Sequence, residues 1–113
     1  MYAVAKAFLH YLNTTNVSED KAWEVDFPKP AYTFLERVYE QDVWDGEFRE
    51  KISAVRAKNI SDLSISEIYT YFTAIICAER VCGGFFEEHA ENGVLKELLE
   101  RYISLCDEKE NAQ

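Results

Sequence analysis

The residues best suited to chemistry are Glu79 and Arg80, which interrupt a long apolar segment just before Gly83 and Gly84. A carboxylate beside a guanidinium could bind a ligand or move a proton, with Arg80 as an anion clamp. Neighbouring helix positions diverge by about 100°, however, so the two side chains face different partners. We therefore expect structural roles. Glu79 would accept hydrogen bonds from a proline-containing connector, a tyrosine or a tryptophan, and Arg80 would reach the end of a neighbouring helix.

The double glycine, Gly83 and Gly84, could let a backbone or a ligand approach closely. A phosphate-binding loop would need a strand before it and a Lys-Ser or Lys-Thr pair after it, and the sequence has neither. We predict a tight turn between two helices.

Other catalytic and metal-binding patterns are missing from the sequence. His89 has no glutamate three residues before it, which a di-iron helix motif requires, and no cysteine or histidine cluster suggests zinc. Cys77 and Cys82 lie in an apolar segment without a nearby histidine to activate a thiol. We therefore predict no catalytic residue, no cofactor and no metal site.

The chain is strongly acidic, with 21 Asp and Glu against 12 Lys and Arg and a net charge of −9. This charge argues against direct binding to nucleic acid or to anionic membranes, both of which need basic groups. Acidic residues are concentrated in the last third of the chain, and those of the candidate face are Glu87, Glu88, Glu91, Glu97 and Glu100. They form either a solvated helix surface or a face for a basic partner.

Apolar residues repeat at helical spacing along most of the chain, and no segment alternates long enough to indicate a strand. We predict an all-α, compact single-domain bundle of five or six helices over residues 1–106, followed by a polar tail over 107–113. The expected helices are Tyr2–Leu12, Ala31–Gln41, Glu47–Lys58, Ile65–Cys82, Phe85–Glu91 and Val94–Leu105.

Two local signals refine this pattern. Ser64-Ile65-Ser66-Glu67 is a capping box that should begin the fourth helix. Val17–Pro30 contains two prolines and several aromatic residues, so we expect an extended connector there.

The compartment is predicted from the cysteines and from the N-terminus. Three cysteines are an odd number without the spacing of a disulfide framework, which fits a reducing environment. No stretch has the length of a membrane span, and the first residues lack the pattern of a secretory leader. We expect a cytoplasmic protein.

Two motifs connect the chain to a known family. Ala78–Gly84 reads AERVCGG and Glu91–Tyr102 reads ENGVLKELLERY, and together they resemble the signature of the uncharacterised domain of unknown function 6508 family. Val81 departs from the phenylalanine that the resemblance leads us to expect after the Glu-Arg pair. The resemblance implies one helical domain and brings no function with it.

Composition and motifs together favour a non-catalytic protein that binds another protein. The sharper hypothesis is an inhibitor or decoy that covers a basic, nucleic-acid-binding surface of its partner. In size and charge the chain is similar to inhibitors encoded by phages and mobile elements, including anti-CRISPR proteins. The alternative is a small-molecule-binding protein or enzyme with an interhelical pocket around Glu79 and Arg80. A self-associating structural protein is a third possibility, since the sequence leaves the oligomeric state open.

Overall fold

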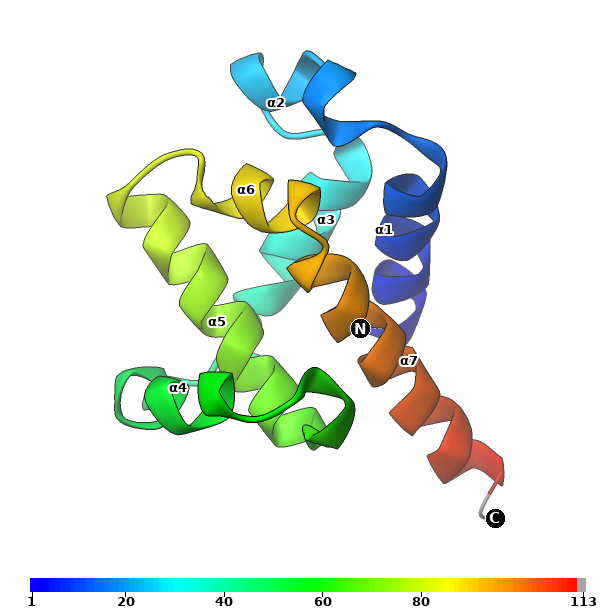
Figure 1. Cartoon of the computed structure of the whole chain (residues 1–113), viewed down its shortest axis with the longest axis vertical. Helices are drawn as coiled ribbons and strands as arrows, with labels where there is room; N and C mark the ends of the chain where they lie inside the picture. Colours follow the sequence, from blue (N-terminus) through cyan, green and yellow to red (C-terminus); the bar gives the residue numbers. More distant parts are fainter. Residues whose placement is uncertain (112–113) are drawn as a thin grey trace.

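Seven α-helices and two short 3₁₀ helices make up residues 1–111, the part of the chain that this computed structural model describes (Figure 1). The predicted all-α fold is confirmed, with one helix more than the upper expectation. In chain order the elements are α1 (Tyr2–Thr14), η1 (Val17–Glu19), α2 (Ala22–Val25), α3 (Lys29–Val38), α4 (Phe48–Ala57), η2 (Ile60–Asp62), α5 (Ile65–Val81), α6 (Phe85–Glu91) and α7 (Val94–Asn111).

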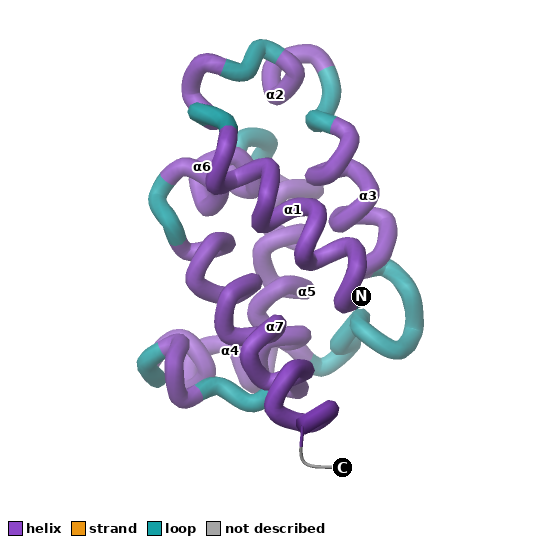
Figure 2. The backbone as a smooth tube through the Cα atoms, turned by 90° about the vertical axis from the view of Figure 1, so that its right-hand side faces the viewer, coloured by secondary structure: helices purple, strands orange, loops and turns teal. Residues whose placement is uncertain are grey.

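The core is built from helices that cross around a cluster of phenylalanine rings. Helix α1 packs on α3 and α7, while α5 contacts α3, α4, α6 and α7. Figure 2 shows α1 and α7 in front with α5 behind them. Phe8, Phe34, Phe72 and Phe86 are fully buried. Phe34 touches both Phe8 and Phe72, with ring centroids 5.0 and 4.9 Å apart, and Phe86 meets Phe8 at 5.8 Å, so the rings join four helices in one core.

Helix α5 begins where the capping box predicts. The Ser64 hydroxyl accepts the Glu67 N–H at 3.2 Å, and the Glu67 carboxylate accepts the Ser64 N–H at 3.0 Å. The helix ends at Val81, one residue before the predicted end. None of the helices over residues 1–111 is long and apolar enough to span a membrane.

The prediction of an extended connector over Val17–Pro30 was wrong, because η1 and α2 lie within it. Hydrogen bonds from side chains fold this segment. Asn16 caps η1. The Tyr11 hydroxyl donates a hydrogen bond to the Asp20 carboxylate, and it accepts one from the Trp23 indole N–H at 2.9 Å. Burial raises the pKa of Tyr11 to about 12, and the bond from Tyr11 lowers the pKa of Asp20.

The last helix is longer than expected. Helix α7 continues to Asn111 instead of ending at Leu105, so most of the predicted polar tail is helical. The Tyr2 hydroxyl donates to Asp107 at 2.7 Å and fastens this extension to the start of α1. Residues 112–113 of the predicted tail lie outside the described part of the chain. Helix α3 also differs, running from Lys29 to Val38 rather than from Ala31 to Gln41.

Asp45 holds the loop between α3 and α4 against α5. Its carboxylate accepts the Thr70 hydroxyl at 2.6 Å, the Glu47 N–H at 2.9 Å and Lys51 at 3.3 Å. Its own N–H donates to the Thr73 hydroxyl at 3.1 Å. Burial alone would raise the pKa of Asp45, but these hydrogen bonds and Lys51 bring the pKa below its ordinary value.

Candidate functional site

The α5–α6 connection is the tight turn that the double glycine predicts. Gly84 has φ +96°, in the left-handed region that favours glycine. Gly83 has no such requirement, because a Cβ there would lie 3.5 Å from the Glu79 Oε2, at ordinary van der Waals distance. Only Gly84 therefore needs to be glycine for the turn to form.

Glu79 closes this turn by capping helix α6. Its half-buried carboxylate accepts the Gly84 N–H at 3.1 Å and the Phe86 N–H at 3.0 Å. These free amides belong to the first turn of α6, where a negative charge is favourable. Glu79 thus accepts hydrogen bonds within the fold, but the predicted donors were wrong: backbone amides of the turn donate to it rather than the connector, a tyrosine or a tryptophan.

Arg80 points to a different part of the molecule. Its exposed guanidinium lies 5.8 Å from the centre of the Tyr39 ring, at the end of α3. Glu79 lines a pocket with both glycines, and Arg80 is not among the residues that line it. Glu79 and Arg80 therefore have different partners, and Arg80 lies outside the pocket that Glu79 lines.

The pocket beside the double glycine has a volume of about 310 Å³, and we call it the glycine pocket. It lies at the end of the molecule where α2 faces the α5–α6 connection (Figure 1). Four of its residues are acidic, two are aromatic and none is basic. The lining residues are Trp23, Glu24, Val25, Asp26, Phe27, Glu79, Gly83, Gly84 and Glu87.

The acids of the glycine pocket lack a cationic partner in the described part of the chain. Within residues 1–111, Glu24, Asp26 and Glu87 form no ion pair with a lysine or an arginine. Burial raises the pKa of Glu87, and repulsion from Glu91, Glu24 and Glu79 adds to the effect. No three His, Cys, Asp or Glu residues of the described chain are placed to hold a metal ion. The pocket is therefore an acidic hollow with aromatic walls.

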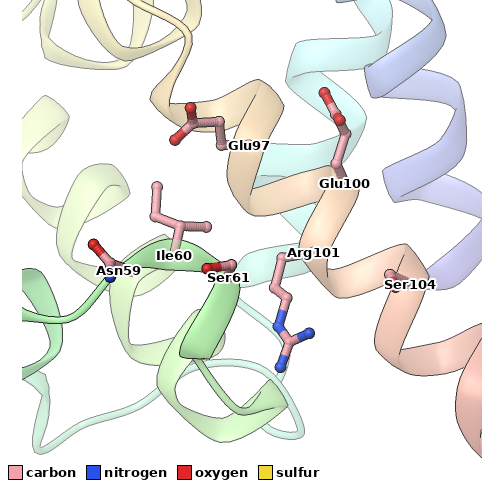
Figure 3. Close-up of a pocket in the computed structure, with 7 residues that line it drawn as sticks. All are labelled: Asn59, Ile60, Ser61, Glu97, Glu100, Arg101 and Ser104. Carbon is pink, nitrogen blue, oxygen red and sulfur yellow. The ribbon is translucent and has the colours of Figure 1, made fainter.

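Residues of the predicted acidic face lie at different hollows of the surface. Glu87 lines the glycine pocket, whereas Glu91 lines a separate hollow against η1. Glu97 and Glu100 line a groove of about 540 Å³ between η2 and α7, and Figure 3 shows them pointing in different directions. Arg101 in the same groove donates through Nε to the Leu63 carbonyl at 3.0 Å. Glu88 is exposed and lines none of these hollows.

Sequence reasoning missed two acids of the site, Glu24 and Asp26. They come from α2 and the residue after it, inside the segment that we expected to be an extended connector. The available signal was the alternation of acids with apolar and aromatic residues in Trp23–Phe27. Val25 in this run is 91% exposed, which places an apolar side chain at the edge of the glycine pocket.

Comparison with known families agrees with the two sequence motifs. The model of the family of unknown function DUF6508 matches residues 21–108. The chain belongs to this family. All nine residues that line the glycine pocket fall within the matched region, so the pocket is built entirely from the family domain. No curated protein and no solved structure matches the chain.

Proposed function

We propose that this DUF6508 protein binds a partner protein and that the glycine pocket receives a lysine or arginine side chain from a basic surface of that partner. The observation that carries the proposal is the set of acids without a cation, Glu24, Asp26 and Glu87, around one pocket. Burial is the main cause of the raised pKa of Glu87 and repulsion from Glu91, Glu24 and Glu79 adds to it, so a cation placed among the carboxylates would relieve the repulsive part.

The walls of the pocket suit the rest of a basic side chain. Trp23 and Phe27 lie edge to face with ring centroids 5.9 Å apart, and both line the pocket. Lysine and arginine pack their aliphatic stems on apolar surface and interact favourably with aromatic faces. Aromatic walls with a carboxylate rim therefore favour a basic side chain over a free anion or a purely apolar group.

The overall charge points to the class of partner. A chain with a net charge of −9 is attracted to basic surfaces, and many basic surfaces of proteins bind nucleic acid. We propose that the protein acts without catalysis, as an inhibitor or decoy that covers such a surface. Three free cysteines, Cys77, Cys82 and Cys106, support a reducing compartment, so we propose that it acts in the cytoplasm.

The test is affinity capture from the native host with the full chain, followed by measurement of the dissociation constant for the recovered partner. The pocket variant is Glu24→Lys with Glu87→Lys, and the matched control is Glu88→Lys with Glu100→Lys, which changes the net charge equally outside the pocket. We expect the pocket variant to weaken binding by roughly a hundredfold and the control by less than about fivefold. Binding should also weaken as salt rises.

Each result decides a different part of the proposal. Equal losses of affinity in the pocket variant and the control would mean that the glycine pocket is not the contact and that only the overall charge matters. If the affinity did not depend on salt, the proposal that the partner binds through a basic surface would be wrong.

A further inference from the structure

A second surface, outside the glycine pocket, combines aromatic rings with arginines. The Arg80 guanidinium lies over the Tyr39 ring, which stacks on Trp44 with ring centroids 5.1 Å apart and planes at 17°. Trp44 meets Phe48 edge to face at 6.5 Å, and the Arg49 guanidinium lies 5.3 Å from the centre of the Phe48 ring. We call these five residues the arginine–aromatic row. They come from three elements, the end of α3 with its loop, the start of α4 and the end of α5.

The arginine–aromatic row is accessible to a partner. Tyr39 is 40% exposed, Arg49 and Arg80 are exposed, and Trp44 and Phe48 are half-buried. Tyrosine, tryptophan and arginine are the residue types that contribute most to binding energy in protein interfaces. This surface therefore has the composition of an interaction site.

The two arginines indicate the charge of what binds. Neither Arg49 nor Arg80 forms an ion pair or a hydrogen bond through its guanidinium with any side chain or backbone group of residues 1–109. Arg37 nearby differs, because it binds Asp42 through two nitrogens at 2.8 Å each. A guanidinium stacked on a ring keeps the N–H groups at its edge free, and their fork matches a carboxylate.

We infer that the arginine–aromatic row binds a short segment of a partner protein that carries one or two carboxylates beside an apolar residue. Phosphate offers similar acceptors, but nucleic acid needs several cations along its backbone, and the row offers two in a chain of net charge −9. A short acidic peptide needs no more than two cations. Its carboxylates pair with Arg49 or Arg80, and its apolar residue packs on the exposed ring of Tyr39 and the half-buried ring of Trp44.

Random peptide display on the immobilised full chain tests this inference. We expect enriched peptides to contain Asp or Glu beside an apolar residue, and the enriched peptides are then synthesised and titrated against variants. Arg80→Gln and Arg49→Gln should each weaken binding by roughly tenfold. Arg56→Gln is the matched control, since Arg56 also lies over a ring, that of Tyr71 at 5.8 Å, outside the row. It should leave the affinity unchanged.

Three results would overturn the inference. The first is a selection that does not enrich acidic residues. The second is an equal affinity of Arg80→Gln and Arg56→Gln for the peptide. The third is displacement of the peptide by a single-stranded oligothymidine. The glycine pocket is tested with Glu24 and Glu87 variants, so failure at one surface is separate from failure at the other.

Discussion

The carboxylates of the loop between α3 and α4 and those of the glycine pocket differ in how many donors and cations surround them. Asp45 accepts from Thr70, Glu47 and Lys51, and these donors lower its pKa despite burial. In the glycine pocket Glu79 accepts hydrogen bonds from two backbone N–H groups, whereas Glu87 has no cationic partner in the described chain and has a raised pKa. Carboxylates in one small domain therefore range from saturated to uncompensated.

This difference separates residues that hold the fold from residues that are available to a partner. A hydrogen bond to a charged group stabilises the folded state, whereas a carboxylate beside other carboxylates destabilises it. An uncompensated charge persists in a small protein at a cost in stability, which function can justify. Three substitutions along this series test the comparison.

Asp45→Ala should have the largest effect, lowering the free energy of unfolding by about 2–3 kcal/mol because Thr70 and Lys51 lose their acceptor. Urea unfolding at pH 7 measures the loss. The pKa of Asp45 is lower in the folded protein than its ordinary 3.8, so its stabilisation is present above pH 3.8 and is lost as the pH falls through the folded value. The difference between wild type and variant should therefore shrink in acid.

The control for Asp45 is Glu50→Ala, an exposed acid on α4 that forms no ion pair with the described residues. It should change the free energy of unfolding by less than about 0.5 kcal/mol. A loss for Asp45→Ala no greater than that of the control would contradict the anchoring role of the loop.

Glu79→Ala should have an intermediate effect, about 1 kcal/mol, because it removes the cap of α6. Glu79→Gln retains one acceptor oxygen and should lose less. Hydrogen exchange gives a local measurement, with protection of the Phe86 amide falling more in the alanine variant than in the glutamine variant. Unchanged protection in both variants would mean that the carboxylate does not hold the first turn of α6.

The fold was predictable wherever a signal was local. The bounds of α6, Phe85–Glu91, were predicted correctly because glycine-containing turns flank it, with Gly84 and Gly93 both at positive φ. The start of α5 followed from its capping box in the same way. In each case the residues that set the boundary lie within a few positions of it.

The errors came from contacts between distant residues. Helix α2 was missed because Tyr11, in another helix, binds both Asp20 and Trp23 and folds a segment that its prolines make look extended. The extension of α7 depends in part on the contact between Tyr2 and Asp107. Such contacts leave no periodic pattern in the sequence.

The candidate site was predictable only in part for the same reason. The sequence indicated Glu79 and the glycines as one group, because they are close along the chain. The divergence of adjacent helix positions also predicted that Glu79 and Arg80 face different partners, and only the alternative hypothesis placed both in one pocket. Glu24 joins the glycine pocket from α2 and was missed, since only the fold brings that helix beside the α5–α6 turn.

Glu87→Gln should have the smallest effect on stability, and the effect should be a gain. The pKa of Glu87 is higher in the folded protein than its ordinary 4.5, so ionisation destabilises the fold as the pH rises above that value. At pH 7 the variant should gain no more than about 0.5 kcal/mol, because solvent screens a partly exposed charge. As the pH falls through 4.5 the carboxyl group becomes protonated in the unfolded state as well, so the gain should shrink and then vanish in more acidic solution.

Glu88→Gln, at the exposed neighbouring position, is the control for Glu87→Gln and should change stability little at either pH. Thermal unfolding at pH 7 and pH 4 measures both variants. A loss of stability for Glu87→Gln at pH 7 would mean that Glu87 already has a favourable partner, and its contrast with Asp45 would disappear. If Glu87→Gln instead stabilises the free protein and weakens its complex, the charge of Glu87 serves binding rather than folding. A basic partner then supplies the cation that the pocket lacks.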